Sequence, residues 1–211
     1  MASLSDSLWH RNQELVEAAL QHPFVQGIAS GELVRATFAY YVGQDAAFLD
    51  AYCRAYALAL AKSPDHDGLM VFKELLDAAI DELRLHQGYA ARWDIDLHQE
   101  PDPATSAYTD FVLAVAALEP VGHIAAAMAP CMRLYAYLGQ HLAAQTKPEN
   151  PYREWVIAYS SPEFEALARR LEGLLDRYGG DHDRLAGLYH RAMELELRFF
   201  DAAAIAAPSR Q

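Results

Sequence analysis

The sequence of 211 residues has only two cysteines, Cys53 and Cys131. This scarcity excludes a disulfide-rich secreted domain, and we expect both to be free thiols in a reducing cytoplasm. No apolar run reaches the roughly 18 residues that a membrane-spanning helix requires. The opening stretch, MASLSDSLWHRNQELVEAAL, lacks the basic start and apolar centre of a secretory signal peptide. These absences together predict a cytoplasmic protein.

Basic residues are also few. The chain has 17 Lys and Arg against 29 Asp and Glu, which gives a formal net charge of −12. An acidic surface repels phosphate backbones and anionic lipid, so we expect neither nucleic acid nor a membrane as partner. Hydrophobic residues make up 53% of the chain, enough for a large core. We predict a single domain over residues 1–211.

Strand signals are scarce, because few stretches alternate apolar and polar residues and β-branched residues are sparse. Apolar residues instead recur every three or four positions, and alanine is abundant, which favours helix. Proline and glycine signals divide the chain. The pattern predicts an all-α bundle with helices near residues 4–20, 34–62, 67–95, 104–117, 121–145, 150–159, 162–178 and 182–206.

One acidic residue lies on an apolar helix face. In YYVGQDAAFLDAYCRAY (40–56), Asp45 is spaced to share a face with Tyr41, Phe48, Leu49 and Tyr52. A carboxylate among aromatic rings loses hydration and needs a hydrogen-bonding partner. That partner is either structural, a neighbouring helix or a buried water, or it is the amidine-like N–H groups of a ligand, and the spacing alone leaves both interpretations open.

Glu196 repeats this pattern in LYHRAMELELRFFDAA (188–203), where it falls among apolar residues that include Met193, Phe199 and Phe200. Desolvation there would raise the pKa of its carboxyl group toward the range useful for proton transfer. A partly exposed position at the edge of the stripe is the alternative.

Cys131 follows Pro130 inside the apolar run MAPCMRLYAYLGQ (128–140), with Tyr135 one turn later on the same face. Pro130 either interrupts one long helix or occupies the first turn of a new one. In the second case the thiol would lie near a helix N-terminus, which lowers a thiol pKa. We interpret Cys53, in contrast, as an inert small hydrophobic residue.

Seven segments, in this order and spacing, resemble the TenA/thiaminase II family. They are HPFVQGIASGEL (22–33), YVGQDAAFLDAYCRAYALALAK (41–62), DELRLHQGYAARWDIDL (81–97), TSAYTDFVLAVA (105–116), APCMRLYAYLGQHL (129–142), NPYREWVIAYSSPEF (150–164) and ELELRFFDAA (194–203). The resemblance implies a heme-oxygenase-like helical bundle, assembled as a homotetramer, without a metal or an organic cofactor.

The resemblance also implies an activity in thiamin salvage. It is hydrolysis at the aminopyrimidine methylene carbon of thiamin or of 4-amino-5-aminomethyl-2-methylpyrimidine, which yields 4-amino-5-hydroxymethyl-2-methylpyrimidine. By position in the family segments, Cys131 is implied as the nucleophile and Glu196 as the catalytic acid and base, while Asp45 is implied to bind the pyrimidine amino group and ring nitrogen. The pocket residues implied in the same way are Phe48, Tyr108, Tyr135, Tyr159 and Phe199.

The chain departs from the family at two places. Family members often carry an aromatic residue at the positions of Ala47 and Arg133, so we expect an altered pocket wall. Arg133 points about 200° away from Cys131 on an ideal helix. We therefore interpret it as a surface or subunit-contact residue that does not activate the thiol.

Two alternatives to hydrolysis remain open on the sequence. One is a non-catalytic pyrimidine or heme carrier, because His10 and His22 lie early in the chain, where heme-oxygenase-like proteins place an axial ligand.

The other alternative is a di-iron oxidase, for which Glu82/His86 and His190/Glu194 have the i, i+4 spacing of metal ligands. We interpret Glu82 and His86 as an exposed or subunit-contact pair. Glu194 has Arg198 one turn away as a surface partner.

Overall fold

The computed structural model describes residues 3–206, and every regular element in that range is a helix, which confirms the all-α prediction. In the same range no helix combines the length and hydropathy of a membrane span. The helices are α1 (Leu4–Arg11), α2 (Gln13–Leu20), α3 (Pro23–Ser30), α4 (Arg35–Lys62), α5 (His66–Trp93), α6 (Pro103–Leu118), α7 (Val121–Ala143), α8 (Arg153–Ser160), α9 (Pro162–Tyr178) and α10 (His182–Ala206).

The N-terminal region differs from the prediction. The helix predicted near residues 4–20 is two helices that meet at Asn12, whose buried amide donates to the Leu8 carbonyl at 2.8 Å. The α3 helix was not predicted, because its start and stop signals were interpreted as two separate breaks. Pro23 occupies its first turn, and Gly31 ends it with a positive φ of 79°.

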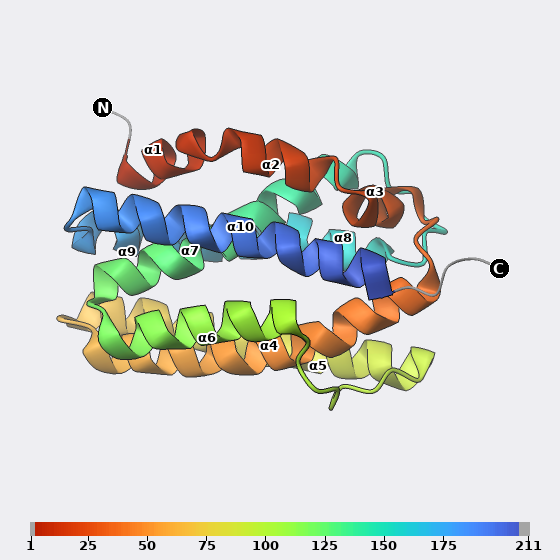
Figure 1. The fold of residues 1–211 in the computed structure, drawn as a ribbon, viewed down its shortest axis with the longest axis horizontal. Coiled ribbons are helices and arrows are strands. Elements are labelled where there is room, and N and C mark those ends of the chain that lie inside the picture. Colours follow the sequence, from red (N-terminus) through yellow and green to blue (C-terminus); the bar gives the residue numbers. More distant parts are fainter. Residues whose placement is uncertain (1–2, 207–211) are drawn as a thin grey trace.

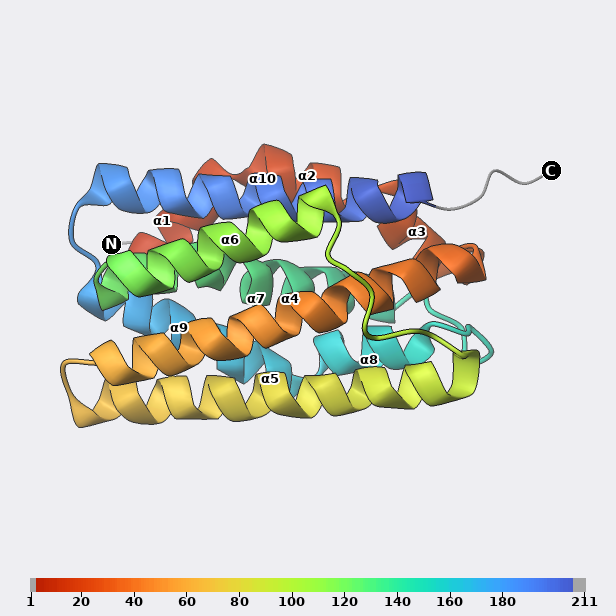
Figure 2. The ribbon, with the colours of Figure 1, turned by 60° about the horizontal axis from the view of Figure 1, so that its bottom comes forward.

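The helices pack side by side along one long axis (Figure 1). The α4 and α5 helices form an antiparallel pair, and α6 packs along α4 (Figure 2). On the other side of α4 lies α7, which contacts α8, α9 and α10. Most of α7 is buried, so its side chains reach the interior from the centre of the bundle. The functional site described below lies where α4 and α5 face α7, α8 and α9.

Pro130 lies inside α7, which continues without interruption from Val121 to Ala143. The structure therefore selects the first of the two sequence interpretations, and Cys131 is not at a helix N-terminus. A lowered thiol pKa through the helix dipole is excluded for this position, because that effect acts only within the first turn.

Gly139 sets the distance between α7 and α8. A Cβ atom at this position would lie 2.5 Å from the Tyr159 carbonyl carbon and 2.6 Å from the Ser160 nitrogen. The close approach places Tyr159 beside Tyr135, with ring centroids 4.8 Å apart. The glycine thus positions two of the predicted pocket tyrosines.

We expect Gly139→Ala to lower the free energy of unfolding by about 1–3 kcal/mol, since the added methyl group must push two backbones apart. Urea denaturation measures this change. Gly173 in α9 is the matched control, because it is exposed and an added Cβ meets no atom within 4 Å. We expect Gly173→Ala to gain about 0.5–1 kcal/mol from helix propensity. A gain in both variants would contradict the packing role.

Candidate active site

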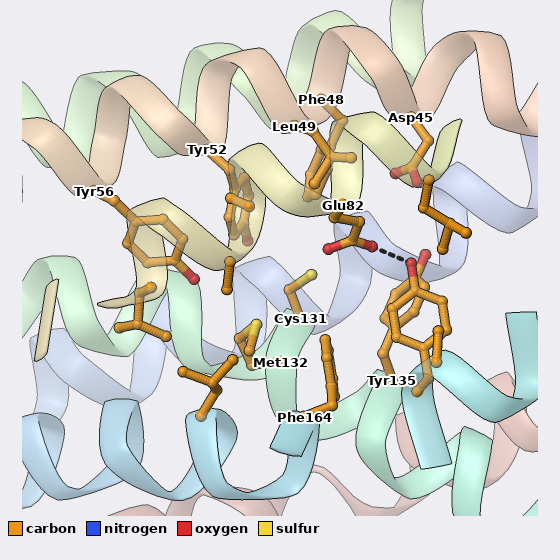
Figure 3. Close-up of a pocket in the computed structure, with 17 residues that line it drawn as sticks. Asp45, Phe48, Leu49, Tyr52, Tyr56, Glu82, Cys131, Met132, Tyr135 and Phe164 are labelled. Atoms are coloured by element: carbon orange, nitrogen blue, oxygen red, sulfur yellow. Dashed lines mark hydrogen bonds between the residues drawn. The ribbon is translucent and has the colours of Figure 1, made fainter. Parts of the chain in front are cut away.

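A cavity of about 140 Å³ lies between α4 and α5 on one side and α7, α8 and α9 on the other (Figure 3). Asp45, Phe48, Cys131, Tyr135 and Tyr159 all line it, so the fold brings five of the eight predicted site residues into one chamber. Leu49, Tyr52 and Tyr56 line it as well, which extends the predicted α4 stripe by one turn. The remaining lining residues are Leu75, Ala78, Ala79, Glu82, Leu85, Met132, Ala158, Phe164 and Leu167.

Asp45 is buried and has a partner on the neighbouring helix. Its Oδ2 lies 2.7 Å from His86 Nε2, and the side chains of Asp45 and His86 are only 5% and 4% exposed. The helix partner is therefore observed. Asp45 also lines the cavity, and its role toward a ligand stays a prediction.

The two ring nitrogens of His86 both face acceptor oxygens. Nε2 faces the Asp45 carboxylate, and Nδ1 lies 3.0 Å from the Glu82 backbone carbonyl, which cannot donate. A neutral imidazole carries only one N–H, so it could donate to only one of them. Burial lowers the pKa of His86, but the hydrogen bond and charge of Asp45 outweigh it and raise the pKa to about 9. At neutral pH the pair is an imidazolium bound to a carboxylate.

We expect His86→Gln to destabilise the protein by about 3 kcal/mol at pH 7, because it leaves a buried carboxylate without its counter-charge. The folded pKa of His86 lies above its unfolded value of 6.5, so its contribution is fully present below pH 6.5 and is lost as the pH rises through about 9. The difference from wild type should therefore shrink at pH 10. Urea denaturation at both pH values measures it, and ¹⁵N NMR that found a neutral His86 ring at pH 7 would contradict the assignment.

The interpretation of Glu82 and His86 as an exposed or subunit-contact pair was wrong. His86 is buried against Asp45, and half-buried Glu82 lines the cavity and accepts a hydrogen bond from the Tyr159 hydroxyl. Burial, followed by the charge of Asp45, raises the pKa of Glu82 to about 7. The site therefore has a carboxyl group that the sequence analysis did not assign to it.

Cys131 lies in the middle of the cavity, near Glu82 (Figure 3). Glu196 of α10 lies outside the lining of the cavity, close enough to the thiol that each group shifts the pKa of the other. Burial and the charge of Glu196 raise the pKa of the Cys131 thiol well above its usual value. The Cys131 thiol is therefore protonated at neutral pH, and a base must remove its proton before it can act as a nucleophile.

Glu196 has the properties that such a base would need. Its side chain is almost fully buried, 1% exposed, so the alternative of a partly exposed edge position does not hold. Burial raises the pKa of Glu196 to about 7, even though the hydrogen bond from Tyr108 and the nearby Cys131 thiol favour the ionised form. A carboxyl group with this pKa both takes and returns a proton at neutral pH.

Glu196, Tyr108 and Phe199 form a second layer behind the cavity. The Tyr108 hydroxyl donates to Glu196 Oε1 at 2.7 Å and lies 3.3 Å from the Tyr52 hydroxyl, which reaches the chamber. Phe199 packs against Phe48 with ring centroids 5.7 Å apart. These three predicted residues support lining residues and are absent from the lining itself.

The two departures from the family pattern do not alter the chamber wall, because neither Ala47 nor Arg133 lines the cavity. Arg133 is not a surface residue, as its side chain is only 12% exposed. It binds Glu165 at 2.8 Å and Glu172 at 2.7 Å and so joins α7 to α9. The expectation that it does not activate Cys131 stays consistent with this position.

The residues of the di-iron alternative do not face one another. The Glu82/His86 pair is inside, whereas His190 and Glu194 lie on the outer part of α10. Glu194 contacts Arg191 at 3.0 Å, in place of the predicted Arg198. Residues 3–206 contain no group of three His, Cys, Asp or Glu side chains arranged for a metal ion.

The heme alternative relied on His10 and His22. His10 is exposed, and His22 caps α3 by accepting the Phe24 N–H at 3.2 Å while its Nε2 lies 3.2 Å from Asp201. Neither histidine lines the cavity.

Two signals in the sequence could have found the unassigned site residues. Tyr56 continues the α4 stripe four residues after Tyr52. On α5, Leu75, Ala79, Glu82 and His86 recur at intervals of four, three and four, which is one helix face. That spacing places Glu82 on an inward-facing stripe.

The model of the TENA/THI-4/PQQC family matches residues 9–206, nearly the whole chain. The chain belongs to this family. The resemblance drawn from the seven sequence segments is thereby confirmed.

Individual family members agree with this assignment. The chain is 33% identical to a protein from Halalkalibacterium halodurans named aminopyrimidine aminohydrolase, over 95% of each chain. It is 32% identical to the bifunctional TH2 protein, mitochondrial, of Arabidopsis thaliana, over 98% of this chain but only 38% of that longer protein.

Solved structures from inside and outside the family show the same fold. A TenA homologue from Pyrococcus furiosus superposes with a TM-score of 0.89 at 26% identity, covering 95% of this chain and 99% of that one. Heme oxygenase-1 from Synechocystis superposes with a TM-score of 0.58 at 17% identity, over 95% of this chain and 92% of that one. The predicted heme-oxygenase-like bundle is confirmed.

Proposed function

We propose that this family member is an aminopyrimidine aminohydrolase of the thiaminase II type, which acts in thiamin salvage. The substrate is an aminopyrimidine that carries a leaving group on its methylene carbon, either thiamin or 4-amino-5-aminomethyl-2-methylpyrimidine. The observation that carries the proposal is a chamber lined by the Cys131 thiol and the Glu82 carboxyl group, with the Glu196 carboxyl group behind the thiol, where burial raises the pKa of both carboxyl groups to about 7. The relative from Halalkalibacterium halodurans supports it by its name.

Asp45 binds and polarises the ring in this proposal. One of its oxygens is held by His86, which leaves the other free for the amino group and protonated ring nitrogen of the pyrimidine. A carboxylate among aromatic side chains, close to the ring nitrogen, favours the cationic ring. A cationic pyrimidine is a better electrophile. The aromatic walls formed by Phe48, Tyr135 and Tyr159 fit a flat ring and exclude water.

The thiol then attacks. Glu196 takes the proton of Cys131, and the sulfur forms a bond to ring carbon C6, which moves an electron pair into the ring. That pair expels the substituent from the methylene carbon. An amine leaves with the proton that Glu196 returns, whereas the thiazolium of thiamin leaves as a neutral thiazole and needs none. Water adds to the methylene carbon and loses a proton, the pair returns to the ring and expels the sulfur from C6, and the thiolate regains a proton. With the amine, the proton of water passes through Glu196 to the sulfur. With thiamin, Glu196 returns the proton that it took from Cys131, and the proton of water goes to solvent.

The experiment is to incubate the purified protein with thiamin and, separately, with 4-amino-5-aminomethyl-2-methylpyrimidine. Formation of 4-amino-5-hydroxymethyl-2-methylpyrimidine, followed by liquid chromatography and mass spectrometry, is the expected result. The absence of product from both compounds would reject the proposed function.

We also propose a cytoplasmic homotetramer. Apolar side chains on the outer face of α5, namely those of Leu69, Met70 and Ile80, are 37–40% exposed and would be covered by a second subunit. Light scattering during size-exclusion chromatography tests this, and a monomer at micromolar concentration would refute it.

A further inference from the structure

The hydroxyl group of Tyr56 is buried and has no hydrogen-bond partner. Tyr56 is 2% exposed, and it lines the cavity, with its hydroxyl directed toward the interior (Figure 3). An unpaired buried hydroxyl costs roughly 1–3 kcal/mol, which a ligand that bonds to it would recover. The mechanism above does not use this group.

Tyr56 lies at the opposite end of the cavity from Asp45 (Figure 3). The two residues are separated along α4 by roughly 16 Å, at 1.5 Å of rise per residue. Asp45 faces His86 on the antiparallel α5. Counting the same number of residues along each helix, in opposite directions, places Leu75 of α5 opposite Tyr56 of α4. The chamber is therefore longer than one six-membered ring with its substituents.

The lining changes in character along this length. The Asp45 end carries the carboxylate and the hydroxyls of Tyr135 and Tyr159, together with Glu82. Toward Tyr56 the lining is formed by the apolar side chains of Leu75, Ala79 and Met132. Tyr56 lies one turn beyond Tyr52 on α4, and its hydroxyl is unpaired, whereas the Tyr52 hydroxyl lies 3.3 Å from that of Tyr108. Such a surface fits a mostly apolar group that ends in one hydrogen-bonding atom.

Cys131 lies between the two ends (Figure 3). When the pyrimidine ring is held at Asp45 and its reacting carbons are at Cys131, the substituent on the methylene carbon extends toward Tyr56. Glu82, beside Cys131, is placed to pair with a positive charge on the atom that joins this substituent to the methylene carbon.

Building on the proposed function, we infer that the Tyr56 end is the subsite for the leaving group, and that this group is a heterocycle with a polar arm. The thiazolium of thiamin, with its hydroxyethyl arm, has this chemistry. An amino group alone would leave the subsite empty and the Tyr56 hydroxyl unpaired.

The test compares kcat/KM for thiamin with kcat/KM for 4-amino-5-aminomethyl-2-methylpyrimidine in wild type, Tyr56→Phe and Tyr189→Phe. Tyr189 is the matched control, because it also has a fully buried hydroxyl without a partner but does not line the cavity. We expect Tyr56→Phe to lower kcat/KM for thiamin, relative to kcat/KM for the amine, by roughly 3- to 10-fold, which is the effect of one hydrogen bond. The ratio should not change in Tyr189→Phe.

An unchanged ratio in Tyr56→Phe overturns the subsite. This includes the case in which both constants fall equally, because Tyr56 would then serve the shared ring. Wild-type turnover of the amine without turnover of thiamin also overturns it, while the proposed function stands. If wild type turns over neither compound, the proposed function fails. Calorimetric titration with thiamin still decides the inference: weaker binding to Tyr56→Phe than to wild type supports it, and equal binding refutes it.

The unfolding temperature without ligand shows that the variants are folded. Both Tyr→Phe changes remove an unpaired buried hydroxyl, so we expect each to raise the unfolding midpoint. Added thiamin should then stabilise wild type and Tyr189→Phe more than Tyr56→Phe. Equal stabilisation of all three proteins would contradict the inference.

Discussion

Replacement of Cys131 by serine is expected to lower kcat on the order of 10³-fold for both substrates, with little change in ligand affinity. Serine fits the space of cysteine, but its hydroxyl has a far higher pKa than a thiol. Glu196, with a pKa of about 7, can accept a proton from a thiol that a cationic ring has made more acidic. It cannot do so from an alcohol at any useful rate.

The measurement combines steady-state kinetics with calorimetric binding of the product, 4-amino-5-hydroxymethyl-2-methylpyrimidine. Cys53→Ser is the matched control, because Cys53 is the other cysteine and does not line the cavity. We expect its kcat to stay within about twofold of wild type, as for substitutions away from a site. If Cys131→Ser keeps more than a tenth of wild-type kcat, the thiol is not the nucleophile.

Replacement of Glu196 by glutamine is expected to lower kcat/KM on the order of 10²-fold or more, the usual contribution of a general acid or base. The loss should be larger with 4-amino-5-aminomethyl-2-methylpyrimidine than with thiamin. In the proposed mechanism ammonia needs the proton that Glu196 returns, whereas the thiazole departs without one. Equal losses with the two substrates would restrict the role of Glu196 to the first proton transfer.

Burial raises the pKa of both Glu196 and Glu82 to about 7, so the pH profile of wild type alone cannot tell them apart. The profiles of two variants can. Removal of the Cys131 proton requires ionised Glu196, so wild-type kcat/KM should rise as the pH increases through about 7. We expect this rise to disappear in Glu196→Gln and to remain in Glu82→Gln. The reverse result would make Glu82 the base.

Glu196 should also make the stability of the folded protein depend on pH, in the opposite direction from activity. The folded pKa of Glu196 is raised from 4.5 to about 7, so the folded state binds the proton more tightly and stability falls as the pH rises between these values. The loss amounts to on the order of 3 kcal/mol. Glu196→Gln cannot ionise and should lose less free energy of unfolding between pH 4.5 and pH 8 than wild type, as measured by urea denaturation.

Much of this protein could be predicted from the order of its residues. Periodicity and proline positions predict the long helices, because burial of one apolar face and the missing N–H of proline are local properties. Asp45 and Glu196 were identified because an acid among apolar residues is costly unless it has a partner. The seven segments predict the family, which the match over residues 9–206 confirms.

Other features depended on how the helices meet. Whether Pro130 starts a helix or lies within one is decided by the packing of α7 at the centre of the bundle. The i, i+4 pair of Glu82 and His86 is compatible with an exposed or a buried helix face, and only the contact of α5 with α4 places His86 against Asp45.

The sequence by itself determined that the chain is helical and which side chains are unusual for their surroundings. The tertiary structure alone decided that Glu82 joins Cys131 in one chamber and that Tyr56 closes its far end. The reason is physical: helix periodicity depends on neighbours within a few residues, whereas burial, charge pairing and an unpaired hydroxyl depend on what another helix places opposite.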